Sequence, residues 1–403
     1  MKKLAVFLPC FLAGWVALAQ PDVQKRYQTR LIVAEDGSTI ELDEGRFLFS
    51  GSLSLEDKKN VVIRGKGIDK TILSFKGQTD GAEGIRVSNA ENIVLENMTI
   101  QDTKGDGIKT MNVKGITFRN VKVEWTGKPS KNNGGYGLYP VQCDNVLIDQ
   151  CIAIGASDAG IYVGQSRGIV VKNSKAWHNV AGIEIENSTD AEVFNNETYE
   201  NTGGLLVFDL PDLVQKKGGR IRVFKNNIHD NNYPNFAPKG NIVAGVPDGT
   251  GVMVLATNQV EIFDNQIIRN KSIGTGIFSY FITENPISDK AYDPYPTGVS
   301  IHDNVYERDA VRPTGRGRLG KLFRFKLKFG NDVPHILYDG IVDSTMLDAQ
   351  GQVRADKRIC IRNNQNQSFA NLDAAQGFKT ISRETAPHDC ALEPLKVAAI
   401  QSK

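Results

Sequence analysis

The stretch from Gly84 to Phe278 repeats one short unit: GIRV (84–87), GIKT (107–110), GLYP (137–140), GIYV (160–163), GIEI (182–185), GLLV (204–207), GVMV (251–254) and GIFS (276–279). Most starts lie 22 or 23 residues apart, and the longer intervals mark insertions. A fixed period of this size is typical of a solenoid, in which each repeat packs only against its neighbours.

Each unit also contains a second apolar segment that alternates with period 2. In Ile93–Asn97 the apolar residues Ile93 and Leu95 point one way and Glu96 the other, and Ile116–Asn120 and Ile169–Asn173 repeat this order. Period 2 indicates strands rather than helices, and the separating Gly, Asn and Asp residues suit tight turns. The sequence therefore predicts an all-β fold, a single-stranded parallel β-helix whose stacked coils bury one aliphatic column.

Asparagine ends corresponding strands of successive units. The positions are Asn97, Asn120, Asn173, Asn195, Asn226, Asn265 and Asn304, with Gln150 as one substitute. Asparagine tolerates the left-handed conformation, and stacked amides can bond one another from coil to coil. From Asn195 onward the Asn shifts by one place against its strand, and a β-bulge would account for the shift.

The pattern divides the chain into four parts. Residues 1–19 resemble a secretory signal, with Lys2 and Lys3 before an apolar run too short to span a bilayer and a small-x-small site at 17–19. Residues 20–83 form a cap and the first irregular coils, and the apolar spacing in 21–34 predicts a short capping helix. Residues 84–310 form the regular coils, and 311–403 a last coil, a basic strand and a tail. Polar insertions at 126–136, 209–219, 231–250 and 281–298 are expected to project as loops.

The C-terminal part contains two further features. Residues 312–329 carry seven basic side chains, and the alternation in 323–329 predicts a strand whose charged edge blocks aggregation; a patch for an anionic glycan is the alternative. Cys360 and Cys390 are expected to form a disulfide in an oxidising compartment. Cys143 and Cys151 are separated by a strand and cannot pair.

Composition names no partner. The formal net charge is +2 and 23% of residues are charged, so nothing indicates a nucleic-acid partner. No second apolar run could anchor the chain in a membrane. With the signal segment, this predicts a periplasmic or secreted protein.

Stacking predicts one exposed row of side chains at the outward position of the glycine-started strands. The row runs Arg86, Lys109, Tyr139, Tyr162 and Glu184, and Glu186 lies two residues further on. Successive members would lie roughly 4.8 Å apart. Cations can pair with a uronate carboxylate, and tyrosines offer flat faces to sugars. Asp209 borders the row as a further substrate contact.

The carboxylates near this row leave alternatives open. Acids before the coil starts, such as Asp106 and Asp158, could serve an inverting glycosidase, could ligate Ca²⁺, or could be ordinary turn residues. The histidines have no ligand spacing, so we expect no metal site of that kind and no required cofactor.

Several segments carry a family resemblance: GDGIKT (105–110), YGLYPVQC (136–143), GASDAGIYVGQS (155–166), NVAGIEIENS (179–188), GGLLVFDLPDL (203–213) and NFAPKGNIVA (235–244). They resemble secreted bacterial right-handed parallel β-helix repeat proteins of the pectin-lyase-like group, which includes NosD-type periplasmic proteins. The resemblance implies fold and compartment. The motifs of polygalacturonases, alginate epimerases and pectate lyases are absent.

Two functional hypotheses follow. In the first, the protein binds an acidic polysaccharide and acts as a lyase or epimerase. Arg86 or Lys109 then neutralises the uronate, Tyr139 or Tyr162 is the base, and Glu184 orients the sugar. In the second, the protein is a non-catalytic cell-envelope scaffold that serves a periplasmic partner protein.

Overall fold

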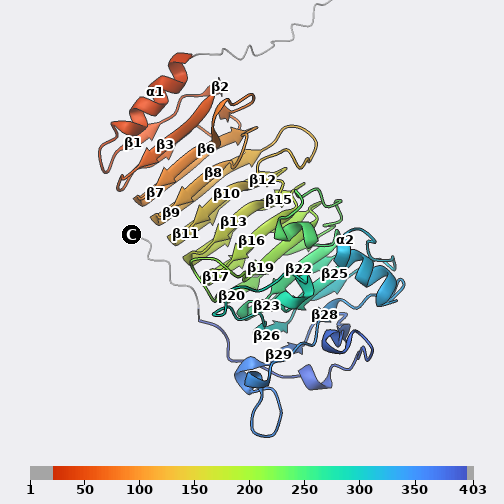
Figure 1. The fold of residues 1–403 in the computed structure, drawn as a ribbon. Coiled ribbons are helices and arrows are strands. Elements are labelled where there is room, and N and C mark those ends of the chain that lie inside the picture. Colours follow the sequence, from red (N-terminus) through yellow and green to blue (C-terminus); the bar gives the residue numbers. More distant parts are fainter. Residues whose placement is uncertain (1–20, 397–403) are drawn as a thin grey trace, which may run out of the picture.

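The computed structural model describes residues 21–396 and shows a stack of parallel coils capped by one helix (Figure 1). The cap is α1 (Pro21–Ile32), which buries Val23, Tyr27 and Leu31 on one face against the first coils. These residues are four apart, so they share one side of the helix. The predicted parallel β-helix fold and its helical cap are both confirmed. The proposed signal segment, residues 1–19, lies outside the described residues.

One face of the stack is an eleven-stranded parallel sheet, here called the row sheet. All of the glycine-started units lie on strands of this sheet. In order its strands are β3 (Gly51–Glu56), β6 (Asp80–Ser88), β8 (Ile108–Met111), β10 (Tyr136–Val141), β13 (Ala159–Gly164), β16 (Ala181–Glu186), β19 (Gly203–Phe208), β22 (Thr250–Leu255), β25 (Ile273–Phe278), β28 (Ile336–Tyr338) and β30 (Phe369–Asn371).

The other strands form a nineteen-stranded sheet that bends into two faces. The first face is β1 (Thr39–Glu41), β4 (Val62–Arg64), β7 (Glu91–Gln101), β9 (Lys114–Glu124), β11 (Asp144–Asp149), β14 (Arg167–Lys172), β17 (Thr189–Phe194), β20 (Gly219–Phe224), β23 (Asn258–Phe263), β26 (Thr297–His302) and β29 (Ile359–Arg362). The second is β2 (Gly45–Leu48), β5 (Thr71–Ser74), the ends of β7 and β9, β12 (Ile152–Ile154), β15 (Lys175–Trp177), β18 (Glu197–Tyr199), β21 (Asn227–His229), β24 (Gln266–Ile268) and β27 (Val305–Glu307).

The core is a continuous aliphatic column inside the coils. Along the row sheet it runs through the paired residues Ile85, Ile108, Leu138, Ile161, Ile183 and Leu205, each 1% exposed or less. Each buried aliphatic side chain contributes about 1.5–3 kcal/mol, and the regular pairing makes each coil the template for the next.

Stacked asparagine amides join successive coils, and they occupy two adjacent columns. Asn97, Asn120 and Asn173 sit at the turn itself, with φ of 60°, 50° and 52°. Asn226 and Asn265 instead sit one residue later, where Asn226 Nδ2 donates to Asn265 Oδ1 at 2.9 Å.

The strands before these turns stay in register, Phe194 opposite Phe224 and Phe224 opposite Phe263. The shift seen after Asn195 is therefore a change of column and not a bulge. A further amide column, Asn179, Asn201, Asn231 and Asn270, was not predicted.

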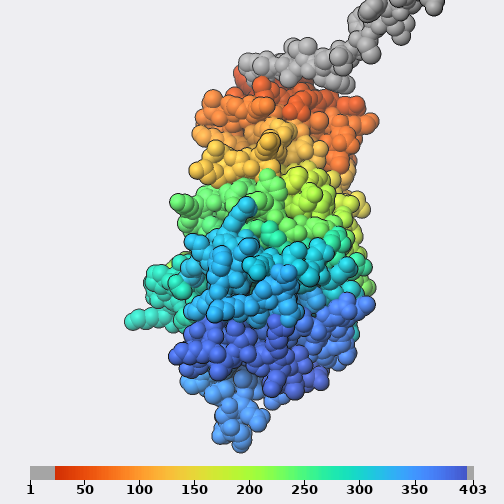
Figure 2. Space-filling model, turned by 90° about the vertical axis from the view of Figure 1, so that its right-hand side faces the viewer, coloured from red at the N-terminus to blue at the C-terminus, as the bar shows by residue number. Residues whose placement is uncertain are grey.

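A second apolar cluster lies outside the row sheet, over its C-terminal half. It contains the outward side chains Leu206, Phe208 and Met253 together with loop residues such as Val243 and Tyr292. The covering segments are the insertions, which include the short helices η1 (Ile242–Gly245) and η2 (Tyr280–Thr283). Figure 2 views this side: green to blue segments overlie the middle of the stack, while the orange N-terminal coils are uncovered.

The basic segment is helical, so the predicted strand over 323–329 is wrong. It forms α2 (Gly317–Lys321) and a π-helical turn (Leu322–Lys326), here labelled η3. Leu319, Phe323 and Leu327 are buried and lie four residues apart, a helical spacing, whereas Phe325 is exposed. The sequence predicted a strand because basic residues at every second position produce an alternating pattern, although the apolar residues also have the four-residue spacing of a helix.

The remaining helices are single turns in the C-terminal part: η4 (Ser344–Met346), η5 (Ala355–Lys357), η6 (Ala374–Gln376) and η7 (Ala386–His388). Cys360 of β29 and Cys390, which follows η7, form a disulfide across a sequence separation of 30. Cys143 and Cys151 are free and buried.

Candidate functional site

The predicted row exists on the outward side of the row sheet. Arg86 lies opposite Lys109 and Lys109 opposite Tyr139, on β6, β8 and β10. Tyr162 of β13 lies opposite Glu184 of β16. The ring centroids of Tyr139 and Tyr162 are 5.0 Å apart. The two halves of the row are therefore in contact and form one continuous column.

Only the N-terminal part of the row is accessible. Arg86, Lys109 and Tyr139 are partly exposed, but Tyr162 is 4% exposed and Glu184 is 1% exposed. The inserted loop 231–249 lies over the deeper part, where Asn241 Nδ2 donates to Asp158 Oδ2 at 2.7 Å. In this structure Glu184 cannot orient a sugar as the sequence predicted, because its carboxyl group does not reach the surface.

Three tyrosines meet where the row passes under this loop. The ring centroid of Tyr136, which the sequence analysis did not single out, lies 4.5 Å from those of both Tyr139 and Tyr162. Lys109 Nζ lies 4.9 Å from the centroid of the Tyr139 ring. The tyrosine cluster therefore already contacts one ammonium group of its own chain through cation–π attraction. The repeated tyrosine in YGLY (136–139) was the available signal.

Four carboxyl groups surround these tyrosines. Burial raises the pKa of Asp106, which is partly exposed, to about 6, while the nearby Lys109 acts in the opposite direction. Burial raises the pKa values of Glu184 and Glu186 above their usual range, and repulsion from Asp158 acts in the same direction, whereas the hydrogen bond from Tyr162 opposes it for Glu186. Burial likewise raises the pKa of Asp158. Glu184, Glu186 and Asp158 therefore hold their protons to a higher pH than ordinary carboxyl groups do, whereas Asp106 is mostly ionised at neutral pH.

Glu184 and Glu186 differ in their hydrogen bonding. Tyr162 donates its hydroxyl proton to Glu186 Oε1 at 2.6 Å. Glu184 has no hydrogen-bond partner for either carboxyl oxygen among the described residues. Burial raises the pKa of Tyr139 to about 12 and that of Tyr162 well above its usual range. The tyrosines are thus proton donors at neutral pH, and the partly exposed Asp106 is the better proton acceptor.

Asp209 does not border an open surface as predicted. It is 0% exposed, and both of its carboxyl oxygens lack a partner within the described chain. The hydroxyl group of Tyr292, from the 279–296 insertion, donates to its backbone oxygen at 2.5 Å. Burial raises the pKa of Asp209 to about 7. The residue lies under a loop, so it does not contact a substrate in this structure.

Two hollows lie along the row sheet, and no row residue lines either of them. One of about 400 Å³ lies beside the turns that end β8, β10 and β13, at Asn112, Gln142 and Gln165, with Val214 of the 209–218 insertion as a wall. Another of about 250 Å³ continues under Asn241 onto Met253. Insertion residues therefore form part of the wall of each hollow.

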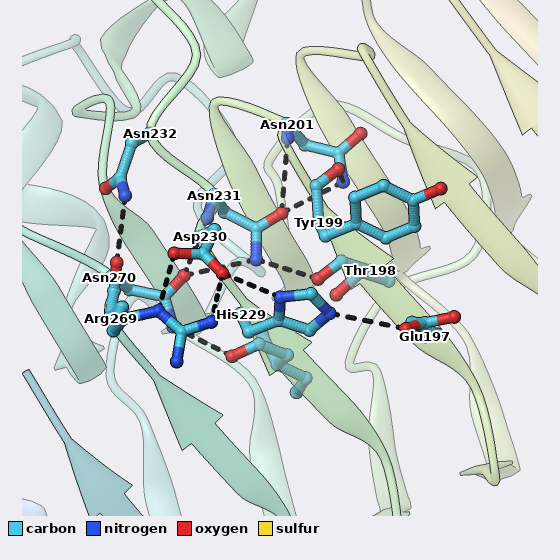
Figure 3. Close-up of polar contacts among 11 residues, drawn as sticks. Glu197, Thr198, Tyr199, Asn201, His229, Asp230, Asn231, Asn232, Arg269 and Asn270 are labelled. Atoms are coloured by element: carbon cyan, nitrogen blue, oxygen red, sulfur yellow. Dashed lines mark hydrogen bonds and ion pairs between the residues drawn. The ribbon is translucent and has the colours of Figure 1, made fainter.

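A different polar cluster lies on the second face of the larger sheet, and most of its side chains are paired (Figure 3). His229 Nδ1 lies 2.8 Å from Asp230, which also accepts from Arg269, and His229 Nε2 lies 3.3 Å from Glu197. The rings of Tyr199 and His229 stack at 5.4 Å. Most of its side chains bond to a neighbouring coil, so this cluster stabilises the stack; the buried hydroxyl group of Thr198 has no hydrogen-bond partner among the described residues.

Within residues 21–396, no group of three or more His, Cys, Asp or Glu side chains has the arrangement of a metal site. None of the helices in this part of the chain is long and apolar enough to cross a membrane.

Comparison with known proteins identifies the family. The profile of the right-handed β-helix region matches residues 32–210 and 112–286, which together cover more than half of the chain. The chain belongs to the right-handed β-helix family. The finer NosD-type grouping stays a prediction.

Similar proteins act on polysaccharides according to their names. The A-module of the mannuronan C-5 epimerase AlgE4 of Azotobacter vinelandii is 18% identical, with a TM-score of 0.57 over 89% of this chain and 94% of that one. The AlgE6 A-module is also 18% identical, with a TM-score of 0.54 over 81% of this chain and 88% of that one. At this identity the likeness shows the fold alone.

A capsule KN3-specific depolymerase of Klebsiella phage KN3-1 is 23% identical over 213 residues, 49% of this chain and 25% of the depolymerase. This chain therefore spans about a quarter of the length of that relative.

Proposed function

We propose that this protein is a secreted or periplasmic enzyme that acts on an acidic polysaccharide, as a lyase or an epimerase of uronate residues. The observation that carries the proposal is the in-register row of Arg86, Lys109 and Tyr139, which leads into a cluster of tyrosines and proton-holding carboxyl groups. The likeness to proteins named as polysaccharide-acting supports the substrate class. The signal-like segment 1–19 supports the compartment.

The two cations suit a uronate carboxylate. Neither Arg86 nor Lys109 forms an ion pair with any described residue, and Arg86 Nε is a buried donor without a partner. They stand on adjacent coils roughly 4.8 Å apart, about the spacing over which two cations can address one carboxylate. A bound uronate would satisfy a donor that the protein leaves free.

Proton transfer in the proposed reaction uses Asp106 and Tyr139. Lyases and epimerases of uronates both begin by removing the proton next to the carboxylate. We assign this step to Asp106, ionised above a pKa of about 6, and not to a tyrosine, because burial keeps the tyrosines protonated. The electron pair from the broken C–H bond moves toward the carboxylate held by Arg86 and Lys109.

Tyr139 then donates the second proton. In elimination the C4–oxygen bond breaks, a C4–C5 double bond forms, and the leaving oxygen takes the proton. In epimerisation the carbon takes it on the opposite face. The hydroxyl–carboxylate pair of Tyr162 and Glu186 lies behind Tyr139 as the source of a replacement proton.

The test is turnover of a panel of polymers of mannuronate, guluronate, galacturonate and glucuronate, followed by ultraviolet absorbance of unsaturated product and by NMR of the sugar stereochemistry. Asp106→Asn and Tyr139→Phe should each lower the activity about a hundredfold or more and keep the melting temperature. Tyr199→Phe is the matched control, because Tyr199 stacks on a different face. The absence of a reaction with every polymer of the panel would refute the proposed enzymatic activity.

One observation favours the second candidate function, a non-catalytic scaffold for a periplasmic partner protein. Tyr162 and Glu184, two residues predicted to be catalytic, are covered by a loop. A scaffold would retain a partner from periplasmic extract on immobilised protein, and Tyr139→Phe would not weaken that retention.

A further inference from the structure

The basic helical segment around α2 is not used by the proposed active site. Its seven cations are Arg312, Arg316, Arg318, Lys321, Arg324, Lys326 and Lys328, and no acidic residue lies between 312 and 329. All seven are exposed. Of these seven, only Arg318 forms an ion pair within the described chain, with Glu284. A charge density of this kind needs an anionic partner or solvent.

The same segment exposes aromatic side chains. Phe325, between Arg324 and Lys326, is 63% exposed, and Phe281 on the facing η2 insertion is 42% exposed. Leu319, Phe323 and Leu327 already fill the inward face of the segment, so Phe325 lies on its outer side, largely exposed and beside a cavity. Exposure to water does not stabilise an apolar phenylalanine ring. Exposed phenylalanines among cations are a feature of surfaces that enter another apolar phase.

A cavity of about 590 Å³ opens between these two segments. Its walls are mostly apolar, among them Phe281, Ile282, Leu322, Phe325 and Phe378, and its charged lining residues are Lys321, Lys326 and the ion pair Arg318–Glu284. Its size and walls suit a hydrocarbon chain, and the two lysines, which have no ion pair among the described residues, suit a negatively charged head group.

We propose that the face formed by α2, η3 and η2 binds an anionic lipid surface, with Phe325 and Phe281 entering the head-group region and the cavity accepting part of an acyl chain. Charge complementarity selects an anionic partner. The apolar cavity and exposed rings then favour a lipid over an anionic glycan, because a glycan would pair with the cations and leave both phenylalanines and the cavity empty. This surface is separate from the row and does not depend on the proposed reaction.

The test is cosedimentation of the mature chain with vesicles of phosphatidylcholine alone or with about 30% phosphatidylglycerol. We expect binding to the anionic vesicles only, weakened by salt. Lys321→Gln with Lys326→Gln should weaken the binding about thirtyfold. Each lysine near an anionic surface contributes about 1 kcal/mol, and the loss of two such contributions corresponds to about thirtyfold in affinity. Phe325→Ser should weaken the binding that survives at high salt.

Lys76→Gln with Lys114→Gln is the matched control. Both lysines are exposed on the N-terminal coils, and this double variant loses the same number of charges as Lys321→Gln with Lys326→Gln. Melting temperatures of all variants verify folding. The proposal is overturned by equal binding to both vesicles, by no binding, or by equal loss in the control. Binding of soluble polygalacturonate through Lys321 and Lys326 without vesicle binding would assign the face to a glycan instead.

Discussion

Asp209→Asn should stabilise the protein in a pH-dependent way. Asp209 is fully buried, neither carboxyl oxygen has a partner among the described residues, and burial raises its pKa to about 7 from the ordinary 3.8. A folded-state pKa above the unfolded value means that the stability present below the unfolded pKa is lost as pH rises through the folded pKa. Asparagine keeps the shape and removes the ionisation.

The magnitude follows from proton linkage. With those two pKa values, ionisation of Asp209 lowers the free energy of unfolding by about 1.7 kcal/mol at about pH 5 and by about 4.3 kcal/mol at about pH 8, relative to the protonated state. The stability of Asp209→Asn relative to wild type should therefore rise by about 2.6 kcal/mol between these two pH values.

The assay is urea denaturation at constant ionic strength at both pH values, with the m-value checked for constancy. Leu210→Val, a non-titrating change at the next residue, is the control and should shift stability equally at both. An Asp209→Asn effect that is the same at both pH values would refute the account of a buried, unpaired carboxyl group.

Three other predictions concern the stack and the site. Asn265→Ala should lower the free energy of unfolding, measured by urea denaturation, by roughly 3–5 kcal/mol, because its buried amide makes five hydrogen bonds, most of them to neighbouring coils. Asn227→Ala is the control and should change this free energy little, because the side chain of Asn227 makes no hydrogen bond among the described residues. Catalytic turnover should rise as pH increases through about 6, where Asp106 ionises, and Asp106→Asn should lose about a hundredfold or more in initial-rate assays. Replacing Cys360 and Cys390 by serine should lower stability by about 3.5 kcal/mol, measured by denaturation, because the disulfide closes a loop with a sequence separation of 30.

The repeat made the fold predictable. A strict interval between glycine-started strands fixes which residues lie opposite each other, so the amino-acid sequence alone places Arg86, Lys109 and Tyr139 on adjacent coils. Their side of the sheet also follows from period 2. The capping helix follows from the spacing of its apolar residues.

The insertions were not predictable in the same way, and they decide the site. Their residues have no period, so nothing in the sequence indicates that loop 231–249 covers Tyr162 and Glu184, or that Asp209 lies beneath Tyr292. The outward column changes from charged to apolar at Leu206, which is the one signal that something would cover it.

Local patterns also mislead where tertiary packing selects one period from two. Residues 323–329 satisfy both an alternating and a four-residue spacing, and the apolar outer face of the row sheet selects the helical one. The sequence pattern places Asn195 and Asn226 in one column, because both lie at turns, although they belong to adjacent columns.

The central claim is that the open end of the row binds a uronate polymer. Isothermal calorimetry with oligosaccharides of mannuronate, guluronate, galacturonate and glucuronate tests it most directly. We predict saturable binding of at least one, weakened about a hundredfold or more in Arg86→Gln with Lys109→Gln and unchanged in Arg46→Gln with Lys76→Gln. No binding of any oligosaccharide, or equal affinity in both double variants, would contradict the claim.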